Sequence, residues 1–117
     1  MQYRWICAYD GGDLASIAVW GVDIRNGNAL LAEVIGQRHD AIEAVVSTAV
    51  RQAMQTNRPI MRAASCRVEV GRALRRAGFI RRGSLPLIVR KLTPKTLGAN
   101  VHVHELWDIF GADLDTF

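Results

Sequence analysis

Three strand-like segments separated by two turn signals occupy the first 35 residues of the chain. Segments 3–9, 14–24 and 29–35 are rich in apolar, β-branched and aromatic residues, as β-strands are. An Asp-Gly-Gly-Asp sequence at 10–13 separates the first two segments, and residues 25–28 contain Asn-Gly, a frequent hairpin turn. The sequence therefore predicts an antiparallel meander of three strands.

A helical pattern follows Gly36, which ends the third strand. Asp40 stands three residues before Glu43, a spacing that resembles an N-terminal capping box. Apolar residues then recur every three or four positions, as in an amphipathic helix of about 16 residues ending before Asn57. These residues are Ile42, Val45, Val46, Ala49, Val50, Ala53 and Met54.

The second half of the chain predicts further elements. A short strand is expected at 60–64, a second helix at 67–77 ending before Gly78, and strands at 79–82 and 85–92. In the second helix, the apolar residues expected to face the core are Val68, Leu74 and Ala77, with Val70 and Ala73 beside them.

The element order is therefore three strands, a helix, a strand, a helix and two strands, followed by a C-terminal tail. It predicts one α+β (mixed α/β) domain over residues 1–117, with a mostly antiparallel mixed sheet and two main helices. Within it, residues 1–35 form the meander, 36–104 the alternating helices and strands, and 105–117 an acidic tail.

Charge is unevenly distributed along this chain of net charge +4. Residues 62–95 carry ten basic groups and one acid, a net +9, whereas residues 96–117 carry four acids and no lysine or arginine. Because arginines neutralise phosphates, five residues are candidates for binding nucleic acid or another polyanion: Arg72, Arg75, Arg76, Arg81 and Arg82. Phe79 is the one aromatic residue in this basic segment, which disfavours stacking on single strands. We expect the segment to be solvated or paired with the acidic tail.

Several functional classes lack their sequence signals. No apolar run approaches the roughly 20 residues that span a bilayer, and no signal-peptide pattern opens the chain. Cys7 and Cys66 are too few for a disulfide scaffold, and we expect both to be buried thiols of a cytoplasmic protein. His102 and His104 alternate along one face but specify no third ligand, so we expect no metal site. Because no apolar run is long enough, we also expect no membrane partner.

Two segments resemble a known family. The sequence VGRALRRAGFIRRGSLPLIVRKL is similar to the closing half of the GNAT superfamily of acyl-CoA N-acyltransferases, in which a helix commonly ends in a Gly-Phe pair, here Gly78 and Phe79. The ending LWDIFGADLDTF resembles tails of GNAT-like proteins linked to cell-envelope polysaccharide and peptidoglycan-peptide transfer, with Trp107 before Asp113 and Asp115. The resemblance covers most of residues 14–117 and implies the C-terminal half of a GNAT-like fold.

The resemblance also implies where acyl-CoA would bind. The family's loop, Q/R-x-x-G-x-G/A, holds the cofactor's pyrophosphate on backbone N–H groups at a helix N-terminus. Gln37 matches its first position, whereas Asp40 and Ile42 replace the glycine or alanine positions, and the Asp40 carboxylate would repel a diphosphate. The cofactor-binding candidates are therefore Gln37, Arg38, Asp40 and Ala41.

No catalytic residue is identified. Many family members carry a tyrosine as general acid four residues before the glycine of the Gly-Phe pair, and Leu74 occupies that position here. We therefore expect a non-catalytic binding or structural module. We also expect a homodimer, because half of a fold leaves a strand edge and apolar surface exposed. The alternatives are a minimal N-acyltransferase using acetyl-CoA or another acyl-CoA, and a protein that binds nucleic acid or another polyanion.

Overall fold

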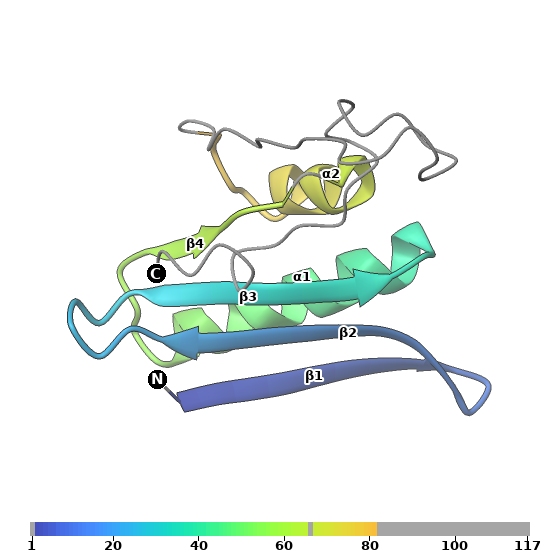
Figure 1. The fold of residues 1–117 in the computed structure, drawn as a ribbon, viewed down its shortest axis with the longest axis horizontal. Coiled ribbons are helices and arrows are strands. Elements are labelled where there is room, and N and C mark those ends of the chain that lie inside the picture. The colour runs from blue at the N-terminus through green and yellow to red at the C-terminus, as the bar shows by residue number, and fades with distance from the viewer. Residues whose placement is uncertain (1, 66, 82–117) are drawn as a thin grey trace, which may run out of the picture.

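The computed structural model describes residues 2–65 and 67–81, which form a four-stranded sheet and two helices (Figure 1). The elements are β1 (Gln2–Asp10), β2 (Asp13–Val22), β3 (Ala29–Gly36), α1 (His39–Gln55), β4 (Met61–Ala63) and α2 (Val68–Arg76). The strands lie in the order β1-β2-β3-β4, with the first three antiparallel and β4 parallel to β3. The α+β class and the mixed sheet with two helices are confirmed.

Both predicted turns of the meander are present, but they differ in length. Gly11 and Gly12 form the two-residue turn between β1 and β2, and both have positive φ angles, 58° and 95°, as a type I′ hairpin requires. The β2–β3 connection is a longer loop over residues 23–28, closed by the Asp23 N–H donating to the Asn28 carbonyl at 2.9 Å. The Asn-Gly signal therefore marks a hairpin without being its two-residue turn.

α1 covers one face of the sheet (Figure 1) and supplies a large part of the core. The largest fully buried side chains are Trp20, Leu31, Ile42, Val34, Val45, Val46 and Val70. The indole Nε1 of Trp20 donates to the side-chain oxygen of Gln52 at 2.8 Å, which satisfies a buried donor and ties β2 to α1. Met54 is 69% exposed, contrary to its predicted place on the apolar face, because successive helical residues point about 100° apart and Ala53, 4% exposed, takes the buried side of that turn.

The predicted capping box at the start of α1 is wrong. The helix begins at His39, its N-cap residue is Arg38, and no side chain makes the expected cap hydrogen bond. Asp40 lies inside the first turn, where its carboxylate accepts the neighbouring Ala41 N–H. Since a capping box needs its acceptor one position before the helix, the Asp40–Glu43 spacing is two residues too late for one.

α2 packs on α1 and ends as its sequence predicts. Val70 and Ala73 are buried, whereas Val68, expected in the core, is 45% exposed because two helical residues in succession turn by about 200°, which places it on the side opposite Val70. Gly78 follows with a φ of 97°, its N–H donates to the Arg75 carbonyl, and the Phe79 N–H donates to the Leu74 carbonyl. This pair of hydrogen bonds is a Schellman motif, so the Gly-Phe pair stops the helix by backbone geometry.

Other expectations fall partly or wholly outside the described residues. Residues 79–81, predicted to begin a strand, do not form one. Cys7 is exposed, not buried as expected, because it lies on the side of β1 facing away from α1. Residue 82, the 85–92 strand and the acidic tail lie outside the described residues. So do Cys66, His102, His104 and Trp107.

Candidate functional site

The junction between β3 and α1 is held tightly against the sheet. A Cβ added to Gly36 would lie 2.9 Å from the Ser16 Cβ and 3.3 Å from the Ala15 carbonyl oxygen, so only glycine fits there. The buried Ser16 hydroxyl donates to the Ala41 carbonyl oxygen at 2.7 Å. The start of α1 therefore has a fixed position over β2.

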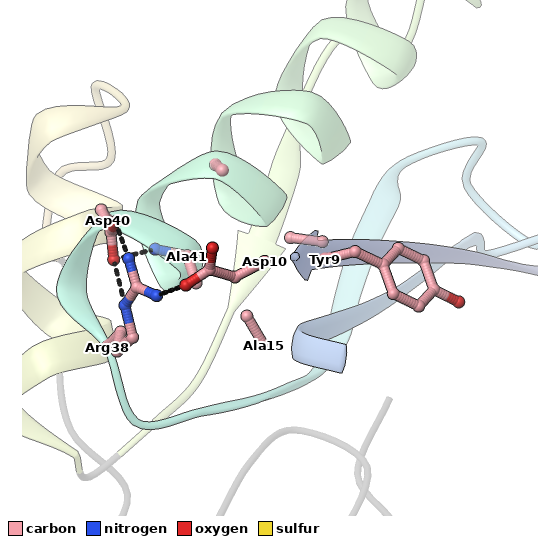
Figure 2. Close-up of a pocket in the computed structure, with 8 residues that line it drawn as sticks. Tyr9, Asp10, Ala15, Arg38, Asp40 and Ala41 are labelled. Carbon is pink, nitrogen blue, oxygen red and sulfur yellow. Dashed lines mark hydrogen bonds and ion pairs between the residues drawn. The ribbon is translucent and has the colours of Figure 1, made fainter. Parts of the chain in front are cut away.

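Three charged side chains gather on this junction (Figure 2). Arg38 makes two hydrogen bonds to the Asp40 carboxylate, Nη2 to Oδ2 at 2.6 Å and Nε to Oδ1 at 3.2 Å. It also forms an ion pair with Asp10, at the end of β1. Asp40 Oδ1 accepts the Ala41 N–H at 2.9 Å. One guanidinium thus joins two carboxylates, and one carboxylate occupies a donor of the first helical turn.

These contacts set the electrostatics of the junction. Hydrogen bonds from Arg38, and then from the Ala41 N–H, lower the pKa of Asp40 below its usual value. Asp40, and then Asp10, raise the pKa of Arg38. With one positive and two negative groups, the cluster carries a net charge of −1. All three side chains are at least half exposed, so salt screens their interactions.

A hollow of about 230 Å³ lies beside the charged cluster. Its walls come from the β1–β2 hairpin and the first turns of α1: Ala8, Tyr9, Asp10, Ala15, Arg38, Asp40, Ala41 and Ala44. In Figure 2 the side chains of Arg38, Asp40 and Asp10 point toward one another, while the Tyr9 ring points away from them. The volume is below the roughly 300 Å³ at which pockets for small molecules begin.

The structure brings together three of the four predicted cofactor-binding residues. Arg38, Asp40 and Ala41 contact one another, and Gln37 is exposed in the turn before them. Sequence reasoning missed Asp10, which is 28 residues from Arg38. The predicted meander indicates this proximity, because in three antiparallel strands the C-terminal ends of the first and third strands lie at the same end of the sheet.

β4 pairs with the first part of β3 alone. Their parallel register ends at the Leu31–Ala63 pair, while β3 continues to Gly36. At the same level β3 carries an irregularity toward β2, where Leu31 pairs with Trp20 and Glu33 pairs with Val19. Ala32 is the extra residue of this β-bulge, which follows the last pair between β3 and β4.

The arginines of α2 form a second candidate surface. Arg72, Arg75 and Arg76 are exposed on this helix, and Arg81 is exposed after it. Arg76 Nη1 lies 2.6 Å from Glu43 Oε1 on α1, so one of these charges is neutralised within the fold. Arg82 lies outside the described residues.

Within 2–65 and 67–81, no three histidine, cysteine, aspartate or glutamate side chains are grouped as a metal ion would need. In the same ranges, neither helix has the length and apolar character to cross a membrane.

Comparison with known proteins relates the chain to solved structures by fold. No protein-family model matches it, and no curated protein matches it. The crystal structure of wild-type TTHA1254 from Thermus thermophilus is similar, with a TM-score of 0.61 and 21% sequence identity over 78% of this chain and 72% of that chain. A point mutant of TTHA1254 gives a TM-score of 0.63 with the same identity and coverage. At this identity, the chain shares a fold with TTHA1254.

Proposed function

We propose that this chain is a GNAT-like domain that has no acyltransfer activity and acts as a homodimeric binding or structural module. The observation that carries the proposal is the hydrogen bond from the Ala41 N–H to the Asp40 carboxylate at 2.9 Å. In the family that the sequence resembles, donors at this turn hold the pyrophosphate of acyl-CoA. Here a side chain of the protein already takes one of them.

The charges around the start of α1 also disfavour the binding of a diphosphate. A diphosphate approaching the start of α1 meets the carboxylates of Asp10 and Asp40, and the guanidinium that would attract it is engaged by both. Freeing Arg38 requires breaking a bidentate pair, the stronger type of charged hydrogen bond. The hydrogen-bonded turn therefore favours its own side chains over a bound anion.

The position of the family's general acid also supports a non-catalytic role. Leu74 is packed against the core, four residues before Gly78. Its side chain has no proton to give to a departing thiolate. Direct attack of an amine on a thioester would need another donor.

A thermal-melt titration with acetyl-CoA tests whether the turn at residues 37–41, which we call the closed turn, excludes the cofactor. Ligand that binds the folded chain raises the melting temperature by mass action, so we expect no shift at about millimolar acetyl-CoA. The Asp40→Gly variant restores the first glycine of the family loop and frees the Ala41 N–H, so we expect it to show a larger shift than the native chain. A clear shift for the native chain overturns the proposal.

A second candidate is a minimal acyl-CoA N-acyltransferase. The length of β3 favours it, because β3 continues to Gly36 beyond its last pair with β4, Leu31–Ala63, and the backbone of such a stretch can pair with an extended ligand. In this hypothesis Gln37, Arg38 and the N–H groups of Asp40 and Ala41 hold the pyrophosphate. An assay for free thiol released from acetyl-CoA in the presence of an amine acceptor tests this alternative. Thiol release by the native chain that is lost in Arg38→Gln would favour it, provided that the control Arg51→Gln, on the exposed side of α1, retains the activity.

A further inference from the structure

β1 lies at the edge of the sheet and carries a row of exposed aromatic side chains. Among the described strands it pairs with β2 alone. Its side chains alternate: Ile6 is buried against the core, whereas Trp5 and Tyr9 are 70% and 65% exposed. Tyr3 and Cys7 share their side of the strand and are exposed too. The side of β1 that faces away from α1 thus carries an exposed, largely aromatic row.

This edge has only some of the features that keep sheet edges apart. Proteins protect exposed edges with lysines, prolines, short strands or inward-pointing charges. β1 is nine residues long and contains neither lysine nor proline. Its two charged residues, Arg4 and Asp10, lie on the side of the strand that carries Ile6, and Arg4 lies over the Trp20 ring at 5.2 Å. They are near opposite ends of the strand and have opposite signs, so two copies of this edge attract each other at both ends.

We propose, as a deepening of the homodimeric function above, that β1 pairs antiparallel with the β1 strand of a second copy of this chain. The twofold axis passes through Cys7. In this register Arg4 lies opposite Asp10 of the partner subunit, and Trp5 lies opposite Tyr9 of the partner subunit. Each pair occurs twice by symmetry, as in any isologous interface. Opposite charges and paired aromatic residues are the favourable cross-strand combinations in sheets.

Other registers fit less well. A shift by one residue would place the aromatic side chains of one copy opposite the core-facing side chains of the other, because faces alternate along a strand. Moving the axis to Ile6 keeps the faces matched but sets Arg4 opposite Ala8 of the partner subunit and Asp10 opposite Gln2 of the partner subunit. That arrangement loses both the charge pair and the Trp–Tyr pair.

The pairing has a structural consequence for each copy. Two four-stranded sheets become one continuous sheet, and the unpaired N–H and C=O groups of both edges are satisfied. The Asp10 carboxylate keeps its ion pair with Arg38, so the interface adjoins the closed turn.

Sedimentation of the full chain under reducing conditions measures the dimer. We expect a concentration-dependent monomer–dimer equilibrium in the micromolar range. Trp5→Lys places a charge on the edge, and because Trp5 occurs twice in the interface, we expect dissociation to increase by about tenfold or more. Ile24→Lys is the matched control, since Ile24 is 84% exposed in the β2–β3 loop, and it should leave the equilibrium unchanged.

Disulfide trapping tests the register. Directly opposite residues of an antiparallel pair have Cα atoms about 4.5–5.5 Å apart, within the range of a disulfide. In a Cys66→Ser chain, oxidation by oxygen with copper phenanthroline should link Cys7 to Cys7 of the partner subunit rapidly. A Cys66→Ser, Cys7→Ser, Ser47→Cys chain carries its thiol on an exposed position of α1 and reports collisional linking alone.

The outcomes separate this inference from the proposed function. A dimer that Trp5→Lys dissociates and Cys7 traps faster than the Ser47→Cys chain supports the β1 interface. A dimer insensitive to Trp5→Lys, or equal trapping in both chains, overturns the interface while leaving a homodimer. A chain that is still a monomer at about 100 µM, far above the micromolar dissociation constant expected here, overturns both the β1 interface and the homodimer. Binding of acetyl-CoA by the native chain overturns only the proposal that the turn at residues 37–41 excludes the cofactor.

Discussion

The hydroxyl of Ser16 in β2 donates a buried hydrogen bond to the carbonyl oxygen of Ala41 in α1 at 2.7 Å. The two residues are 25 positions apart, and Gly36 at the end of β3 is the register partner of Ser16 in the sheet. Three segments, β2, β3 and α1, thus meet beside the turn that carries Arg38 and Asp40. These contacts fix the position of the first turn of α1 on the sheet.

Ser16→Ala removes this hydrogen bond and leaves the rest of the contact intact. We expect a loss of about 1 kcal/mol in the free energy of unfolding, the usual net value of one buried hydrogen bond. Urea denaturation followed by circular dichroism measures it. Ser47→Ala on the exposed side of α1 should change stability by less than about 0.5 kcal/mol. Equal effects of the two substitutions would contradict the role given to Ser16.

Two glycines provide a matched pair for backbone packing. Gly36→Ala places a Cβ 2.9 Å from the Ser16 Cβ, so we expect it to destabilise the chain by about 1–3 kcal/mol. Gly71 lies inside α2 with open space around its Cα, so Gly71→Ala should stabilise the chain by about 0.5–1 kcal/mol. Melting temperatures should therefore move in opposite directions, and a shift of the same sign in both variants would refute this.

Asp40 makes stability depend on pH at the acidic end. Because Arg38 and the Ala41 N–H hold the folded pKa of Asp40 below its unfolded value near 3.9, the stabilisation is complete above that value. It disappears as the pH falls through the lower, folded pKa. Asp40→Asn keeps an acceptor for the Ala41 N–H but does not titrate. We expect its melting temperature to fall less steeply than that of the native chain below about pH 5.

Ionic strength is the control for this pH effect. The side chains of Arg38 and Asp40 are 54% and 69% exposed, so about 1 M salt should reduce the difference between the two melting profiles. Profiles that stay parallel at low salt would show that Asp40 does not carry the acid sensitivity.

The sequence predicts the local elements because their causes are local. Alternating apolar residues, the Gly11–Gly12 turn and the Gly78 helix stop each act within a few residues, and the structure has all three. The start of α1 differs, because Arg38 is the N-cap and is held by Asp40 and Asp10 in place of a capping box. A local pair with Asp40 and a tertiary pair with Asp10 thus stand where the sequence predicts a capping box.

The candidate site depends on contacts between distant residues. Asp10 meets Arg38 only after the strands are paired in register, and Ser16 reaches Ala41 only once α1 lies on the sheet. Composition and spacing contain no direct signal for either contact. The predicted topology does indicate the contact between Asp10 and Arg38, since a three-stranded meander places the C-terminal ends of its first and third strands at the same end of the sheet.

The ion pair between Glu43 and Arg76 provides a test of the polyanion alternative. Glu43 Oε1 lies 2.6 Å from Arg76 Nη1, so Glu43→Gln releases an arginine on the helix that also presents Arg72 and Arg75. If this surface bound duplex nucleic acid, one more phosphate contact would steepen the logarithmic salt dependence of binding by about 0.9. Asp13→Asn, in the β1–β2 hairpin, changes the net charge equally but lies away from α2. Since we propose a role without nucleic acid, we expect fluorescence anisotropy with a random duplex to give the same weak binding and the same slope for both variants. Tighter and steeper binding by Glu43→Gln alone would instead identify the arginine face of α2 as a polyanion site.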